Sequence, residues 1–134
     1  MSFSGLLEDR QLIREFYGAF SYASSCQATE EWLSFWAEEC TWITNHFTLT
    51  GKAAVRDQWG NLWQNFEKVG LLCEVGSIKV EGDHASTGVI VREIIKMKGG
   101  GLYKLIGRYE DNLIRQQGQW RFLRREYFVI AEEV

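Results

Sequence analysis

The spacing of apolar residues along the chain changes near Gly70, from helical to strand-like. Before Gly70, apolar residues recur at the intervals that are typical of helices with one buried face. The first helix is predicted from about Leu7 to Ala23. Its apolar stripe consists of Leu12, Ile13, Phe16, Tyr17 and Phe20. A stripe of this width has to pack against the rest of the protein.

Two further helices and one short strand are predicted before Gly70. The second helix begins at Thr29 and continues through Trp36, and Glu30 and Glu31 suit the positive end of its dipole. The segment "CTWITNHF", residues 40–47, is rich in β-formers and predicts a strand. Gly51 opens the third helix. The apolar side of that helix consists of Val55, Trp59, Leu62, Trp63 and Phe66.

Beyond Gly70, β-branched runs alternate with turn residues. The runs are "LLCEVGSIKV", "ASTGVIVREIIKM", "LYKLIGRYEDNLI" and "WRFLRREYFVI", and the turns between them are "EGDH", "KGGG" and "QQGQ". Short connections of this kind favour consecutive antiparallel strands. The chain is therefore expected to form one α+β domain over residues 1–134, with helices on one side of a curved sheet of about four to six strands.

The last predicted strand carries apolar and charged residues on both faces. One face is expected to hold Arg121, Leu123, Arg125, Tyr127 and Val129. The other is expected to hold Trp120, Phe122, Arg124, Glu126, Phe128 and Ile130. Such a strand is typical of a sheet that lines a pocket on one side and packs on a second subunit on the other. The alternative is that Arg121 and Arg124 pair with carboxylates on neighbouring strands.

Composition excludes several classes of partner. A net charge of −3, with 15 basic and 18 acidic residues spread along the chain, provides no positive field for nucleic acid or an acidic membrane surface. The start of the chain lacks the pattern of a signal peptide, so a cytoplasmic location is expected. Cys26, Cys40 and Cys73 are odd in number and widely spaced, which predicts reduced thiols. No metal-ligand set or glycine-rich phosphate loop is visible, so no cofactor is expected.

The whole pattern resembles the SnoaL-like branch of the nuclear transport factor 2-like superfamily. The matching segments are "WAEECTW", "GKAAV", "VEGDHA" and "GRYEDNLIRQQGQWRFLRR". The terminal hairpin is the most specific of them, with a G-x-Y-x-D strand followed by a W-R-F-x-x-R strand. The resemblance implies a cone-shaped barrel in which three N-terminal helices pack on a strongly bent, mostly antiparallel sheet. It also implies a mostly apolar pocket and a homodimer. The two-sided pattern of the last strand predicts that the dimer forms through the outer face of the sheet, with Trp120, Phe122 or Phe128 contributing.

Members similar to scytalone dehydratase and to hexachlorocyclohexane dehydrochlorinase use an aspartate and a histidine together as a base. The resemblance places Ser25 at the aspartate position and Cys73, or Leu72, at the histidine position, so this dyad is absent. It retains the arginine of the last strand as Arg125. Arg125, Cys73 and Ser25 are the candidate catalytic residues. Because a serine and an unactivated thiol are poor bases, no activity on the substrates of those members is expected.

Members similar to ketosteroid isomerase use a tyrosine of the first helix and an acidic base on the first strand. Tyr17 matches the tyrosine, but the base position falls near Thr44. The resemblance also implies a pocket lined by Tyr17, Phe20, Trp42, Trp59, Trp63 and Tyr127.

Two functions stay open for this pocket. One is an enzyme of lyase or isomerase type, similar to a dehydratase, that acts on a hydrophobic cyclic molecule. The other is a protein that binds a small hydrophobic ligand, or assembles with a partner, without catalysis. Two or more titratable side chains around Arg125 would favour the enzyme, whereas a purely aromatic cavity would favour binding.

Overall fold

The computed structural model describes residues 2–133, and the three expected helices are present. The helices are α1 (Leu7–Ser25), α2 (Thr29–Ser34) and α3 (Lys52–Asn65). The α1 helix ends close to its predicted boundary. The α2 helix is shorter than expected, because Trp36 already begins a strand.

A single mixed sheet of seven strands forms the rest of the fold. The strands are β1 (Phe3–Ser4), β2 (Trp36–Ile43), β3 (Thr48–Thr50), β4 (Phe66–Glu81), β5 (His84–Met97), β6 (Leu102–Gln116) and β7 (Gln119–Glu133). Their order across the sheet is β1-β4-β5-β6-β7-β2-β3. The pairs β1·β4 and β2·β7 are parallel and the others are antiparallel. The count exceeds the expected four to six because β1 and β3 have only two and three residues, too few for a periodic pattern.

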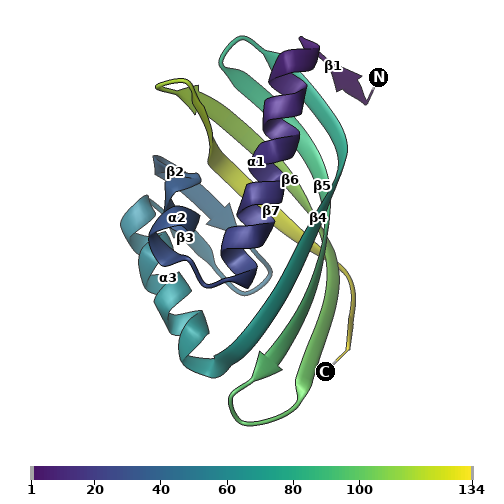
Figure 1. Ribbon diagram of the computed structural model, residues 1–134. Helices are drawn as coiled ribbons and strands as arrows, with labels where there is room; N and C mark the ends of the chain where they lie inside the picture. Colours follow the sequence, from purple (N-terminus) through teal and green to yellow (C-terminus); the bar gives the residue numbers. More distant parts are fainter. Residues whose placement is uncertain (1, 134) are drawn as a thin grey trace.

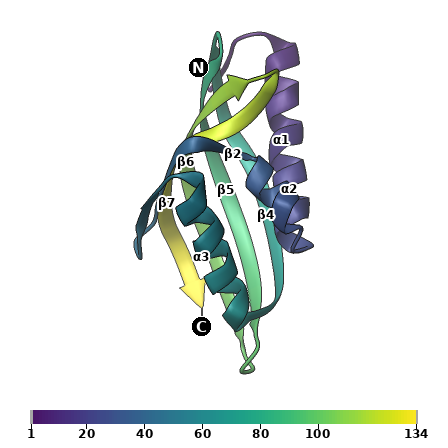
Figure 2. The same ribbon diagram turned by 90° about the vertical axis from the view of Figure 1, so that its left-hand side faces the viewer.

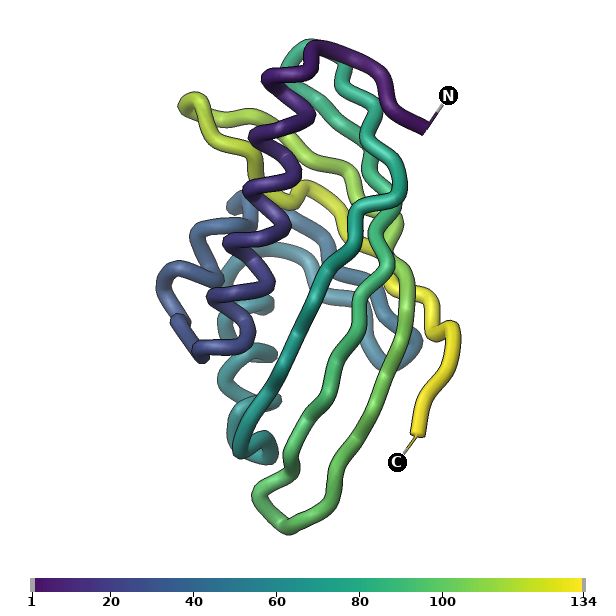
Figure 3. Tube along the Cα trace, turned by 45° about the vertical axis from the view of Figure 1, so that its right-hand side comes forward, coloured from purple at the N-terminus to yellow at the C-terminus, as the bar shows by residue number. Residues whose placement is uncertain are grey.

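The sheet is strongly bent, and the helices lie on its concave side. In Figure 1, α1 crosses the sheet lengthwise, while α2 and α3 cover the end near β2 and β3. Figure 2 shows the curvature of β4, β5 and β6 from the side. The trace in Figure 3 shows the long β5–β6 hairpin extending beyond the helices, near the end of α3. This arrangement confirms the α+β fold predicted from the sequence.

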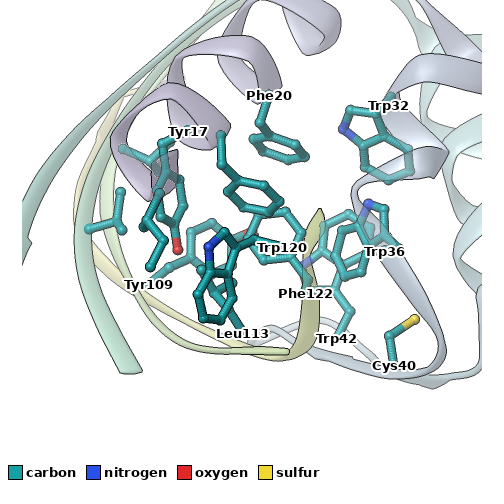
Figure 4. Packing of buried hydrophobic residues seen from close by; sticks show 14 of the residues in the cluster. Tyr17, Phe20, Trp32, Trp36, Cys40, Trp42, Tyr109, Leu113, Trp120 and Phe122 are labelled. Carbon is teal, nitrogen blue, oxygen red and sulfur yellow. Dashed lines mark hydrogen bonds between the residues drawn. The ribbon is translucent and has the colours of Figure 1, made fainter. Parts of the chain in front are cut away.

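Aromatic side chains fill most of the space between helices and sheet. Figure 4 shows Phe20, Trp32, Trp36 and Phe122 gathered beneath the helices, and each of these side chains is buried. The rings of Phe20 and Phe122 lie 5.0 Å apart, and those of Trp36 and Phe122 also lie 5.0 Å apart. Burying one large apolar side chain stabilises a fold by about 1.5–3 kcal/mol. This cluster therefore anchors the helices to β7.

A β-bulge in β7 changes which side chains face inward. Asn112 pairs with Arg124 and the next residue, Leu113, pairs with Phe122, so Leu123 has no partner on β6. The extra residue reverses the alternation of sides within the strand. Trp120 and Phe122 are consequently buried on the same side as Arg125 and Tyr127. The expectation that Trp120 and Phe122 lie on the outer face is wrong.

The outer face of the sheet carries exposed aliphatic residues in its central strands. Leu72 on β4 is 69% exposed, Ile90 on β5 is 42% exposed, and Ile106 on β6 is 38% exposed. Phe128, the remaining residue expected in a dimer contact, is partly buried beneath the Arg108 guanidinium. The homodimer expected from the sequence stays a prediction for this face.

A charge placed at the centre of the outer face should prevent dimer formation. We expect the wild-type chain to form a dimer at micromolar concentration and Ile90→Arg to be a monomer, because an unpaired guanidinium is costly to bury in an interface. Light scattering measures the two masses. Leu12→Arg, at an exposed position of α1, is the control and should leave the dimer unchanged. A wild-type monomer at micromolar concentration would contradict the prediction.

Candidate functional site

A cavity of about 200 Å³ lies between the helices and the concave face of the sheet. Most of its lining is apolar or aromatic. The aromatic side chains in the lining include Phe20, Trp42, Trp59, Trp63, Tyr109 and Tyr127. The indole Nε1 of Trp42 donates a hydrogen bond to the Tyr109 hydroxyl at 3.2 Å, and that of Trp59 donates to the Thr29 hydroxyl at 3.0 Å. These bonds fix the orientation of two indole rings that line the cavity.

A buried ion pair between Arg125 and Asp111 lies at the cavity, and Arg125 is the member that lines it. Arg125 and Asp111 are each 1% exposed, and Arg125 Nε donates to Asp111 Oδ1 at 2.9 Å. The Tyr17 hydroxyl donates to Asp111 Oδ2 at 2.5 Å. Because that hydroxyl has a single proton, the contact of 2.6 Å between Tyr17 and Thr87 has the Thr87 hydroxyl as donor. Both oxygens of the carboxylate are thus satisfied.

Aromatic rings surround the guanidinium of Arg125. Its central carbon lies 3.6 Å from the centroid of the Tyr109 ring, 4.0 Å from that of Phe122 and 5.0 Å from that of Phe20. Burial alone would lower the pKa of Arg125, but the Asp111 carboxylate and the two nearby tyrosines raise it. The side chain is therefore a permanent cation, held between aromatic faces that attract positive charge.

Glu93 is a second titratable group in the cavity. It lies on β5, on the same side as Val91 and Ile95, and it is partly buried. Burial raises the pKa of its carboxyl group to about 7, although the Arg125 cation opposes this shift. Within residues 2–133, no hydrogen bond or salt bridge engages the carboxyl group. Glu93 can therefore take up or release a proton near neutral pH.

Sequence reasoning missed Glu93 as a site residue, although a signal was present. In "VIVREII" an acidic residue occupies a position of the inward, apolar series of a buried strand. An ionisable group in such a position has a displaced pKa or a specific partner. The second series of this strand, Ile90, Arg92 and Ile94, has the same composition, so the alternation on β5 narrows the candidates to Arg92 and Glu93, and the structure shows that Glu93 is the inward one.

The G-x-Y-x-D motif of β6 also proved to be part of the site. Its residues Gly107, Tyr109 and Asp111 occupy alternate positions of the strand, so all of them face the interior. Asp111 binds Arg125, and Tyr109 lies beneath the guanidinium. At Gly107 a side chain would overlap the ring of Tyr127, which occupies that space.

Six of the expected site residues line the cavity. They are Phe20, Trp42, Trp59, Trp63, Arg125 and Tyr127. Tyr17, Ser25 and Cys73 do not line it. The Tyr17 hydroxyl is hydrogen-bonded to Asp111, which does not line the cavity either, and the Ser25 hydroxyl accepts a hydrogen bond from the Leu71 backbone N–H at 2.9 Å. Burial raises the pKa of the Cys73 thiol, which keeps it protonated. The structure thus offers no acid–base role to Ser25 or Cys73.

The two other arginines of β7 face away from the cavity. Arg121 donates to the backbone oxygen of Ser34 at 2.7 Å, and Arg124 pairs with Glu126 of its own strand at 3.0 Å. The expected pairing of Arg121 and Arg124 with carboxylates of neighbouring strands is therefore wrong. Over residues 2–133, no cluster of three or more potential ligands could hold a metal ion. No described helix is long and apolar enough to cross a membrane.

Comparison with known proteins gives both family and fold. A family model described as the SnoaL-like domain matches residues 6–126. A provisionally named scytalone dehydratase from Novosphingobium aromaticivorans is similar in structure, with 22% identity, a TM-score of 0.89 and coverage of 95% of this chain and 87% of that chain. A hexachlorocyclohexane dehydrochlorinase, LinA type 2, has 17% identity, a TM-score of 0.84 and coverage of 95% and 88%.

A third similar structure comes from Kribbella flavida, the Kfla4162 protein, with 14% identity, a TM-score of 0.85 and coverage of 94% and 93%. No curated protein matches the chain in sequence. At these identities, the structural similarity establishes the fold.

Removing the charge of Asp111 should strongly destabilise the protein. We expect Asp111→Asn to lower the free energy of unfolding by about 3–5 kcal/mol, because Arg125 then remains buried without a counter-charge. Asp83→Asn is the matched control, since Asp83 pairs with Arg115 at 3.0 Å but its side chain is 71% exposed. Its cost should stay below about 1 kcal/mol. Urea denaturation followed by circular dichroism measures both, and equal costs would contradict the prediction.

Glu93 should make the stability of the ligand-free protein depend on pH. The folded protein holds the Glu93 proton up to about pH 7, whereas the unfolded chain releases it near the ordinary value of 4.5. Between these values the folded state binds more protons, so the free energy of unfolding falls as pH rises. The fall attributable to Glu93 is at most about 3 kcal/mol.

Urea denaturation at several pH values should show this slope in the wild type and a smaller slope in Glu93→Gln. Glu110→Gln, on the exposed side of β6, should keep the wild-type slope. Identical slopes in the wild type and Glu93→Gln would refute the assignment.

Proposed function

Because the chain belongs to the SnoaL-like domain family, we propose that it is a small-molecule enzyme of lyase or isomerase type that acts on a hydrophobic cyclic substrate. The observation that carries this proposal is the presence of Glu93 and Arg125 in one aromatic cavity. A base with a pKa near 7 and a permanent cation are the two groups that proton abstraction from carbon requires. Glu93 takes the role of the absent dyad.

The dimensions and lining of the cavity support a cyclic substrate. An apolar cavity of about 150 Å³ can hold benzene, so about 200 Å³ leaves room for a ring with small substituents. The flat side chains of Trp42, Trp59 and Trp63 offer faces against which a ring can pack. Similar structures include proteins named for dehydration and dehydrochlorination, both of which are eliminations.

Binding without catalysis is the alternative function. It is supported by the positions of Ser25 and Cys73, which lie where related enzymes have their base and do not line the cavity. In that case Glu93 would serve only to bind a ligand group. The two functions differ in what a change at Glu93 does, because a base affects turnover and a binding group affects affinity.

Turnover by a Glu93→Gln variant distinguishes the two functions. A panel of hydrophobic cyclic compounds that can lose water or hydrogen halide, or shift a double bond, is incubated with the wild type, and products are identified by mass spectrometry and NMR. For any substrate found, we expect Glu93→Gln to lower kcat by about 10²–10⁴-fold with little change in KM. The kcat/KM of the wild type should rise with pH through about 7, as Glu93 ionises.

Glu110→Gln is the control, because it removes a carboxyl group from the exposed side of the neighbouring strand. It should keep wild-type kinetics. Compounds that bind in the cavity without any turnover would support the non-catalytic alternative. A turnover rate that is unchanged in Glu93→Gln would refute the assignment of Glu93 as the base.

A further inference from the structure

We infer that the ligand of the cavity carries a positively charged amino group, and that this group binds to Glu132 where the cavity opens to solvent. The inference deepens the proposed function, because it rests on a hydrophobic cyclic molecule that occupies the cavity and adds the charge of that molecule. In this arrangement the ring lies among the aromatic side chains and the amino group lies at the opening.

The cavity opens between the β2–β3 loop and the end of β7. Most of the lining residues are buried or half-buried, but Asn45, His46, Val129 and Glu132 are exposed. The first two lie in the loop between β2 and β3, and the other two lie near the end of β7. Glu132 is the one carboxylate among these four residues. A ligand that enters here therefore passes an acidic group before it reaches the aromatic walls.

A second bulge in β7 turns Glu132 toward the cavity. The pairing of β7 with β6 passes from Val129 directly to Ala131, so Ile130 has no partner on β6. The extra residue shifts the alternation of sides along the strand. Val129 and Glu132 consequently both line the cavity, although they are three positions apart. Without this bulge, the Glu132 side chain would lie on the outer face of the sheet.

Glu132 shares a row of the sheet with Glu93. Leu105 on β6 pairs with Glu93 on one side and with Glu132 on the other. All three residues line the cavity, so the two carboxyl groups lie on the same side of the sheet, two strands apart. Neighbouring strands are about 4.8 Å apart, which places the two backbones about 10 Å from each other. Charges interact over about this distance at an ionic strength of about 0.1 M, so both carboxylates attract a cation bound near the opening.

The lining offers little positive charge to oppose these carboxylates. Within residues 2–133, Arg125 is the one arginine or lysine that lines the cavity. It is 1% exposed, and its Nε donates to Asp111, so its charge is largely compensated inside the protein. Lys96 and Lys104 lie on the long β5–β6 hairpin but do not line the cavity. A cationic ligand is therefore attracted at the opening, and an anionic ligand is repelled.

The carboxylate of Glu132 is held in place and has an oxygen available for a ligand. The Tyr103 hydroxyl donates to Oε2, and no other hydrogen bond or ion pair engages this carboxylate within residues 2–133. Oε1 can thus accept a hydrogen bond from an ammonium group. Tyr103 also lines the cavity, and the faces of aromatic rings attract cations.

Three water-soluble probes of similar length test the inference without turnover. They share a phenyl ring and differ in the charge of the end group, since 2-phenylethylamine is a cation, 2-phenylethanol is neutral and 3-phenylpropanoate is an anion. Calorimetry at pH 8 and low salt measures their affinities, because Glu93, with a pKa of about 7, is then ionised. We expect the amine to bind about tenfold more tightly than the alcohol, and the anion to bind most weakly.

Glu132→Gln should weaken binding of the amine about threefold and leave binding of the alcohol unchanged, because an ion pair at an exposed carboxylate is lost. In the double variant Glu93→Gln/Glu132→Gln, the amine and the alcohol should bind equally. Glu133→Gln is the matched control. It removes the same charge from the next residue of β7, which does not line the cavity, and should keep the wild-type preference for the amine.

Failure of this inference can be told apart from failure of the proposed function. Equal affinity of the wild type for the amine and the alcohol, equal losses in Glu132→Gln and Glu133→Gln, or no binding of any probe would overturn the inference. Conversion of a neutral cyclic compound would uphold the proposed function in each of these cases. A preference for the amine that depends on Glu132 supports the inference even if no compound is converted, and the enzymatic function alone would then fail.

Discussion

A full positive charge is buried inside an aromatic core, and the neighbouring elements are arranged around it. Asp111 on β6 supplies the counter-charge, Tyr17 on α1 satisfies the second carboxylate oxygen, and Thr87 on β5 satisfies Tyr17. One helix and three strands thus meet in a single network. Buried pairs of this kind add little net stability compared with an apolar replacement. The network is therefore better understood as a device that holds Arg125 in one orientation.

The same charge governs the chemistry of the cavity. Burial disfavours an ionised Glu93, while Arg125 favours it, and the balance leaves the pKa of Glu93 at about 7. A cavity without Arg125 would keep Glu93 protonated to higher pH, and a more open cavity would leave it fully ionised. The apolar walls and the single cation act in opposite directions on one carboxyl group. Their combination produces a group that can both accept and return a proton.

Elements with a clear period could be predicted from the sequence, and features that depend on register could not. The stripe of α1 and the four long strands were predicted because many residues contribute to each pattern. The bulge at Leu123 involves one residue, and it moved Trp120 and Phe122 from the expected outer face into the core. Alternation alone cannot reveal such an insertion.

The site residues also divide into those that a pattern or resemblance could indicate and those that depend on strand register. Six lining residues came from family resemblance, which conveys how strands are placed around the cavity. Ser25 and Cys73 came from the same source, but their side chains do not reach the cavity. Glu93 and the G-x-Y-x-D motif were visible as inward positions on single strands. The sequence could not show that the β6–β7 register sets Arg125 opposite Asp111 and brings the Tyr127 ring over Gly107.

The absence of a side chain at Gly107 has a consequence for ligand size. The phenol ring of Tyr127 rests on the bare backbone of β6, so it lies deeper in the wall than it could over any other residue. The depth of the cavity at this point is therefore set by a residue that does not itself line the cavity. A methyl group at 107 would push the ring toward the cavity. If the proposed ligand binds there, smaller rings would then be favoured while Glu93 and Arg125 stay unchanged. In proteins with this fold, the size of ligand that a cavity accepts can thus change through a residue that only supports one of the lining side chains.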